Sequence, residues 1–149
     1  MKISYKGDYS LKVILDLSKN FPNNLVSILD LSKRQDIPKK FLEQILLDLK
    51  KGGFLMSKKG PKGGYSLARS PETITLGEVV RYVEGSVYPI SCVDPSNPSE
   101  CLEKISCVFA PIWVDVGDAI TSIIDDITFK DLMVKQEQLT KSTVLDFQI

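Results

Sequence analysis

Histidine is absent from this chain of 149 residues, and cysteine and tryptophan are rare, with three copies and one copy. Without histidine, the chain lacks the base that usually activates a catalytic cysteine, so we do not expect an enzyme. Structural zinc sites usually have four sulfur or nitrogen ligands and closely spaced Cys-x-x-Cys pairs. Because the chain has neither such a pair nor a histidine, a zinc site is disfavoured.

Long hydrophobic runs are also missing. No apolar run approaches the ~20 residues that a membrane-spanning helix requires, and the N-terminal segment Met1-Lys2-Ile3-Ser4 lacks the apolar core of a signal peptide. We therefore expect a cytoplasmic protein without a membrane partner, in a compartment where thiols stay reduced.

Positive and negative side chains are equal in number, 19 of each, but they are unevenly distributed along the chain. Residues 1–70 have 14 Lys or Arg against 6 Asp or Glu, whereas residues 71–149 have 5 against 13. A basic half of this kind is typical of a protein that binds a polyanion, because each neutralised phosphate releases condensed counterions. The alternative is that the lysines simply cover solvated helix faces.

The apolar spacing predicts helices that begin at Asp8, at Ser27 and at Pro38, followed by a hairpin of two strands, 54–57 and 65–68. Asp8 and Ser27 are expected to cap their helices, with Leu29 and Leu31 facing inward. The third helix is expected to end at Gly52-Gly53, and its apolar stripe is Phe41, Leu42, Ile45, Leu46 and Leu49.

Thr75 is expected to cap a fourth helix that ends at Gly85, and Thr128 a last helix from Phe129 to about Leu139. Between them lies a long amphipathic helix from Phe109 to Ile127. For the tail, residues 140–149, the sequence predicts no particular secondary structure.

The fold class that follows is mainly α with a small β-hairpin wing: a winged helix-turn-helix plus a long C-terminal dimerisation helix. We expect three parts, a DNA-binding domain at 1–85, a cysteine-containing loop at 86–108, and dimerisation and C-terminal helices at 109–149. The helix from Phe109 carries more apolar surface than a small winged domain needs, which favours pairing with a second copy. The alternative is that it folds back onto its own domain.

Two groups of residues are candidates for DNA contact. Near the start of the third helix, the exposed positions are Lys39, Lys40, Glu43 and Gln44. Glutamine can pair with adenine, glutamate can accept from the cytosine amino group, and lysine can reach guanine or phosphate. The tip of the hairpin adds Lys58, Lys59 and Lys62, which can approach a narrow minor groove. Glu43 is the exception to the positive charge, and it is interpreted as a selectivity element or as an ordinary surface residue.

The chain resembles the Rrf-two family of bacterial winged-helix regulators along almost its whole length. The similarity lies in five motifs, residues 7–9, 41–44, 60–65, 74–79 and 127–132, which read GDY, FLEQ, GPKGGY, ITLGEV and ITFKDL. It implies a homodimeric cytoplasmic transcription regulator that binds double-stranded DNA at a palindromic operator. In the branch that regulates iron–sulfur assembly, the matching residues Glu43, Gln44 and Lys59 take part in sequence reading.

Cys92, Cys101 and Cys107 lie in one short stretch that prolines interrupt. Thiolates are the main protein ligands of iron–sulfur clusters, and a flexible loop can supply them at irregular spacing. Three inert thiols are the alternative from the residues alone.

The resemblance adds a ligand set. Cluster-binding members of the family have three cysteines in this loop, and the iron–sulfur assembly branch adds a histidine that this chain does not have. The nitric-oxide-sensing branch instead uses an aspartate near the N-terminus, contributed across the dimer, and Asp8 stands at the matching place. Asp8 is thus either a ligand or a helix cap. The expected cofactor is an iron–sulfur cluster, 2Fe-2S or 4Fe-4S.

Two other functions stay open. The same DNA-binding regulator could respond through direct thiol oxidation without a cluster. Alternatively, the acidic half could dock a partner protein and the cysteines could be incidental. The family branch that regulates cysteine metabolism lacks these cysteines, which argues against that branch.

Overall fold

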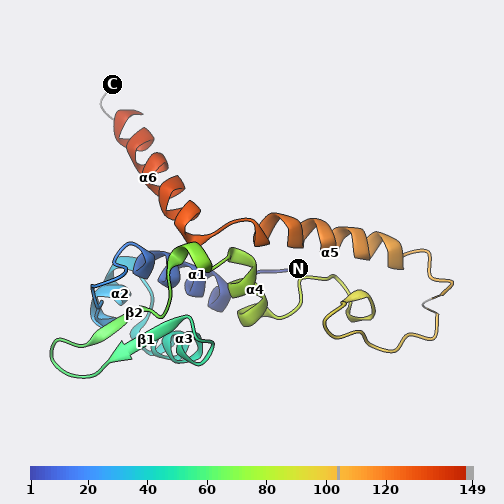
Figure 1. Ribbon diagram of the computed structural model, residues 1–149, viewed down its shortest axis with the longest axis horizontal. Helices are drawn as coiled ribbons and strands as arrows, with labels where there is room; N and C mark the ends of the chain where they lie inside the picture. Colours follow the sequence, from blue (N-terminus) through green and yellow to red (C-terminus); the bar gives the residue numbers. More distant parts are fainter. Residues whose placement is uncertain (104, 147–149) are drawn as a thin grey trace.

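The computed structural model describes residues 1–103 and 105–146. Its helices are α1 (Tyr5–Ser18), α2 (Ile28–Gln35), α3 (Lys39–Lys51), α4 (Leu76–Glu84), α5 (Ala110–Asp125) and α6 (Phe129–Asp146), with 3-10 helices η1 (Pro71–Thr73) and η2 (Ser91–Val93). Strands β1 (Leu55–Lys58) and β2 (Gly64–Leu67) form an antiparallel hairpin in which Leu55 lies opposite Leu67. Three helices followed by a hairpin wing confirm the predicted fold class (Figure 1).

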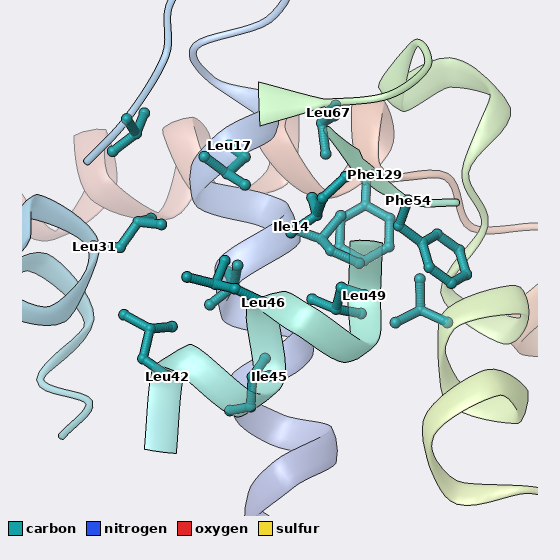
Figure 2. Close-up of a cluster of buried hydrophobic side chains, with 14 of the residues drawn as sticks. Ile14, Leu17, Leu31, Leu42, Ile45, Leu46, Leu49, Phe54, Leu67 and Phe129 are labelled. Atoms are coloured by element: carbon teal, nitrogen blue, oxygen red, sulfur yellow. The ribbon is translucent and has the colours of Figure 1, made fainter. Parts of the chain in front are cut away.

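The core lies where α1, α2, α3 and the wing meet. Side chains from each of these elements point into it, together with Phe129 from the start of α6 (Figure 2). The inner face of α3 is completely buried and consists of Leu42, Ile45, Leu46 and Leu49. These four residues fix the rotation of α3 about its own axis, because turning the helix would expose them to water.

A buried carboxylate holds α2 against α1. Asp16 of α1 is 5% exposed. It lies 2.8 Å from the Arg34 guanidinium and accepts a 2.6 Å hydrogen bond from the Gln35 amide, both on α2. A buried carboxylate requires such partners, because an isolated charge loses its hydration on burial.

Three of the predicted helix caps are confirmed. The side-chain oxygens of Ser27, Thr75 and Thr128 each accept a hydrogen bond from the backbone amide three residues later. Each bond satisfies an amide that has no partner within the helix, which explains why the three helices begin where the sequence indicates.

The predicted start of the first helix is wrong. Ser4, not Asp8, is the N-cap of α1, since its hydroxyl accepts a 3.1 Å hydrogen bond from the Gly7 amide. Glu84 on α4 secures Ser4 by accepting hydrogen bonds from its backbone amide and its hydroxyl, at 2.9 and 2.7 Å. The helix therefore begins one turn earlier, and Asp8 lies within its first turn. The helix ends at Ser18.

Other corrections are smaller. Leu31 is buried as predicted, but Leu29 is 55% exposed, because residues two apart lie on opposite sides of a helix. Phe41 is more exposed than the rest of the α3 stripe and packs edge-on against Tyr9. Both strands begin and end within one residue of their predicted bounds. The last helix runs to Asp146, beyond the predicted Leu139, and residues 147–149 of the tail lie outside the described residues.

Helices α5 and α6 leave the core in different directions (Figure 1). Helix α5 joins α4 through an ion pair of 2.6 Å between Arg81 and Asp125 and through contact between Val80 and Ile124. The cysteine-containing loop lies at the far end of the long axis from the wing (Figure 1). Across the described residues, no helix has the length and apolar character that crossing a membrane would require.

Leu46→Ala should lower the free energy of unfolding by about 2–5 kcal/mol, because it opens a cavity in the buried face of α3. Its neighbour Leu47 is 47% exposed, so Leu47→Ala provides a control in the same helix and should cost less than about 1 kcal/mol. Urea unfolding followed by circular dichroism measures both. Equal losses for the two variants would contradict the orientation of α3.

Candidate nucleic-acid interface and cysteine loop

The outer face of α3 carries the predicted reading residues. Lys39, Lys40, Glu43 and Gln44 are all exposed, and they lie on the side opposite the buried leucines. Lys39 Nζ is 4.0 Å from Glu43 Oε1, so the carboxylate of Glu43 has a cation beside it. The start of α3 thus presents donors and acceptors to solvent from a helix whose rotation the core has fixed.

The wing places its three lysines at an exposed turn. Lys58, Lys59 and Lys62 are exposed, the turn between the strands contains Gly60 and Gly63, and Gly64 begins β2. Backbone packing requires two of these glycines. A Cβ at Gly63 would lie 2.1 Å from the Lys58 carbonyl oxygen, and one at Gly64 would lie 2.5 Å from the Val26 carbonyl oxygen.

Backbone hydrogen bonds attach the wing to the segment just before α2. Val26, just before α2, and Tyr65 in β2 exchange two backbone hydrogen bonds, at 2.8 and 2.9 Å. The wing is therefore held beside the N-terminus of α2 as well as beside α3.

A cleft of about 500 Å³ separates the wing from the ends of α2 and α3. Lys50 lies on its α3 side and donates a 2.6 Å hydrogen bond to Ser57 Oγ in β1. Lys58 and Lys59 line the wing side, and Ser27 and Ile28 bring the N-terminus of α2 to the opposite wall. The cleft therefore has lysine ammonium groups on the α3 and wing sides and the positive end of the α2 dipole on the opposite wall. Such an arrangement suits a phosphate.

Lys50 and Ser27 were missed as interface candidates from the sequence. Lys50 falls on the same helical face as Glu43 and Leu47, seven and three residues earlier, so its spacing contained the signal. Ser27 was recognised only as a cap, and its place in the cleft depends on the pairing of Val26 with Tyr65.

Two of the three cysteines share a pocket. Cys92 in η2 and Cys107 before α5 are both half-buried and line one hollow of about 510 Å³, together with Asp94. Cys101 is exposed and is not among the residues that line this hollow. Among the residues that the structure describes, no three cysteine, aspartate or glutamate side chains come together in a way that could hold a metal ion.

Asp94 gives the loop its local shape. Its carboxylate is 5% exposed and accepts hydrogen bonds from the Ser96 amide and hydroxyl, at 2.8 and 2.6 Å. Hydrogen bonds from the Ser86 and Ser96 side chains hold the pKa of Asp94 below its usual value. The sequence had indicated only an irregular, proline-rich stretch here.

Asp8 lies apart from this pocket. It forms an ion pair of 2.7 Å with Lys12, one turn later in α1. It also lines a separate hollow of about 750 Å³ that the N-terminal segment Lys2–Tyr5 forms. Within one chain, therefore, Asp8 lines a different hollow from Cys92 and Cys107. Thiolates like those of the loop are the main protein ligands of iron–sulfur clusters.

Tyr88 fixes the start of the cysteine loop to α5. Its hydroxyl donates a 2.6 Å hydrogen bond to Asp118, and this bond raises the pKa of Tyr88. Its ring lies against Gly117, where a Cβ would be 2.0 Å from Tyr88 Cδ1. Only a glycine leaves room for the ring at this point of the helix.

The comparisons with known proteins agree on one family. The family model described as Rrf2, iron-dependent transcriptional regulator, matches residues 3–135. The chain is 32% identical to the HTH-type transcriptional regulator IscR of Vibrio cholerae over 149 residues, which cover 100% of this chain and 84% of that protein.

Two solved structures are similar over most of their length. CymR, the global cysteine regulator of B. subtilis, has a TM-score of 0.75 and 29% identity, with 91% of this chain and 98% of that chain covered. IscR of T. potens has a TM-score of 0.73 and 29% identity, with 93% and 90% covered.

Gly117→Ala should loosen the attachment of the cysteine loop, because the added methyl group overlaps the Tyr88 ring. We expect faster hydrogen exchange in residues 86–93 and unchanged exchange in α3, measured by mass spectrometry. Ser122→Ala changes an exposed position of the same helix and should leave both segments unaffected. Unchanged exchange in the loop of Gly117→Ala would show that this contact does not hold it.

Proposed function

The chain belongs to the Rrf2 family of transcriptional regulators, and we propose that it acts as a homodimer that binds a palindromic operator and senses through an iron–sulfur cluster. The observation that carries the DNA-binding part is the shared basic cleft of α2, α3 and the wing. No catalytic activity is required for this function.

In the proposed complex, the start of α3 enters the major groove and the wing follows the backbone into the neighbouring minor groove. Gln44 can pair with adenine, and Glu43 can accept from cytosine while rejecting phosphate. Lys39 and Lys40 can reach guanine or phosphate. The wing lysines Lys58, Lys59 and Lys62 contact phosphates, and Lys59 also takes part in sequence reading, as the family resemblance implies. Lys50 in the cleft adds a further phosphate contact.

A second copy is proposed because α5 leaves much of its apolar surface uncovered. Phe109 before the helix and Ile112 and Ile123 within it are each more than half exposed, and only Gly117 and Ile124 of α5 are buried. Pairing of α5 with the α5 of another copy would remove this surface from water. A two-fold dimer then sets two α3 helices at half-sites about one turn of DNA apart, which is why the operator is expected to be palindromic.

For the cluster, we propose Cys92, Cys101 and Cys107 as ligands, with Asp8 of a second copy as the fourth. Support comes from the shared hollow of Cys92 and Cys107 and from the exposure of Cys101, which leaves its thiol accessible. Asp8 fits as a donor from another subunit because it is not a cap and lines an open hollow of its own. When bound, a 2Fe-2S or 4Fe-4S cluster supplies a group that responds to iron supply, oxidants or nitric oxide.

The protein residues around the loop then determine how its state reaches the DNA. Tyr88 joins the loop to α5, and the ion pair of Arg81 with Asp125 joins α5 to α4. A change in the conformation of the loop can therefore alter the angle between the DNA-binding domains of the two copies. A coupling free energy of about 1–3 kcal/mol is enough to change operator occupancy several-fold.

One observation favours a second candidate. Cys92 and Cys107 are half-buried in a common hollow, so the same regulator could respond by oxidation of these thiols without any cluster. The similarity to the cysteine regulator CymR agrees with a regulator of this fold that works without a cluster.

Replacing Lys58, Lys59 and Lys62 by glutamine should weaken binding to any DNA duplex and lower the slope of log affinity against log salt by up to about 3, since each lost phosphate contact removes ~0.9. Fluorescence anisotropy at several salt concentrations measures this. Glutamine at Lys130 and Lys135, which are exposed on α6, is the control and should leave the slope unchanged. A slope that stays the same in the wing variant would refute the phosphate contacts.

Anaerobic purification should give a coloured protein that contains iron and sulfide, as absorption spectra and chemical analysis can show. We expect Cys101→Ala to lose the colour and Asp8→Ala to lose or alter it, whereas Asp115→Ala, at an exposed carboxylate on α5, should not change it. A colourless, iron-free wild-type protein that still binds its operator would contradict the cluster and favour thiol oxidation. An unchanged spectrum in Asp8→Ala would remove Asp8 from the ligand set.

A further inference from the structure

We propose that Asp48 is a positioning residue for sequence recognition: it orients the Gln44 amide so that α3 prefers adenine over guanine. This inference rests on the proposed reading of DNA by Gln44 and extends it. Asp48 lies one turn after Gln44, at the boundary between the buried and exposed faces of α3.

A carboxylate oxygen meets the Gln44 amide directly. Gln44 Nε2 donates a hydrogen bond of 3.0 Å to Asp48 Oδ1. The other oxygen of the same carboxylate, Oδ2, lies 2.7 Å from Lys6 Nζ on α1. Asp48 is thus held by a cation on one side while it accepts from glutamine on the other.

The backbone of Asp48 is anchored as well. Its carbonyl oxygen accepts hydrogen bonds from the Tyr82 hydroxyl of α4 at 2.8 Å and from the Gly52 amide at 2.9 Å. The Tyr82 ring packs against Gly52, where a Cβ would lie 2.6 Å from Tyr82 Cζ. It also packs against the Phe54 ring, with 5.3 Å between the two ring centroids. Contacts from α1, α4 and the end of α3 therefore fix the position from which the carboxylate acts.

An ionised carboxylate accepts hydrogen bonds but cannot donate them. The hydrogen bond from Lys6 lowers the pKa of Asp48, so the group stays ionised at neutral pH. A flipped Gln44 amide would place its oxygen against the carboxylate and lose the bond. The Nε2 end of Gln44 is therefore directed toward Asp48, and one N–H and the Oε1 acceptor remain for DNA.

This restriction decides which base fits. In the major groove, adenine offers a donor at N6 and an acceptor at N7, whereas guanine offers two acceptors, O6 and N7. An amide with one free N–H beside one oxygen complements adenine. The Gln44 amide cannot donate to both guanine acceptors unless its bond to Asp48 breaks. Even then, Gln44 Oε1 would have no donor on guanine to accept from.

The test uses the full-length protein and an operator obtained by in vitro selection from random duplexes. Gln44→Ala first identifies the adenine that Gln44 reads, and the affinity ratio between adenine and guanine is then measured there by fluorescence anisotropy. We expect Asp48→Ala to reduce this ratio roughly three- to tenfold, the range that one side-chain hydrogen bond supplies. Ratios at the other operator positions and the affinity for random duplex DNA should stay unchanged.

Asp48→Asn should lose the ratio as Asp48→Ala does, because Lys6 competes for its single oxygen and its NH2 group can donate to a flipped Gln44 amide. Glu72→Gln neutralises an exposed carboxylate in η1 and serves as the charge control. Because Asp48 acts through Gln44, the ratio for Asp48→Ala combined with Gln44→Ala should equal that of Gln44→Ala alone.

Several results would overturn the inference while the proposed function stands. These are an unchanged ratio in Asp48→Ala, equal loss at all operator positions, additive effects in the double variant, or an Asn variant that keeps the full ratio. If the wild-type protein selects no operator, or if Gln44→Ala changes no position, the proposed reading of DNA fails and this inference fails with it.

Discussion

Burial of one face of α3 is the constraint on which the rest of the structure depends. Leu42, Ile45, Leu46 and Leu49 are removed from water by α1, α2 and the hairpin, as Figure 2 shows for their side chains. Each fully buried leucine or isoleucine contributes about 1.5–3 kcal/mol relative to exposure, so the four together resist any rotation of the helix. The orientation of every polar residue on the outer face follows from this packing.

The same packing connects the DNA-facing surface with the remainder of the chain. Helix α4 touches α3 through Tyr82 and α5 through Arg81, adjacent residues on one short helix. Because α5 also carries Asp118, which binds Tyr88, the cysteine loop and α3 are joined by a short series of contacts, even though the loop and the wing lie at opposite ends of the molecule (Figure 1). This arrangement provides a physical connection for the proposed sensing, in which hydrogen bonds and an ion pair lie beside apolar contacts such as that of Val80 with Ile124.

Local chemistry explains where prediction from the sequence works and where it does not. Ser27, Thr75 and Thr128 cap their helices through bonds to amides three residues away, so a short stretch of sequence contains all the necessary information. The start of α1 was misplaced because Ser4 is secured by Glu84, 80 residues away. Cys92 and Cys107 were predicted to act together, and they share a hollow, but Cys101 and Asp8 lie outside it. The spacing of cysteines along a loop does not determine how that loop folds.

By itself, the sequence determined the order of helices and hairpin, the basic and acidic halves and the family motifs. Because histidine is absent, it also restricted the candidate cluster ligands to cysteines and a carboxylate. These properties depend on residue type and on spacing within a few turns of chain. Only the tertiary structure decided that Asp48 faces Gln44 and Lys6, that Lys50 lines a cleft with the wing, and that Gly117 makes room for Tyr88. The contacts of Asp48 with Lys6 and of Gly117 with Tyr88 join segments that are distant in the chain, and they form only when burial of a common core brings those segments together.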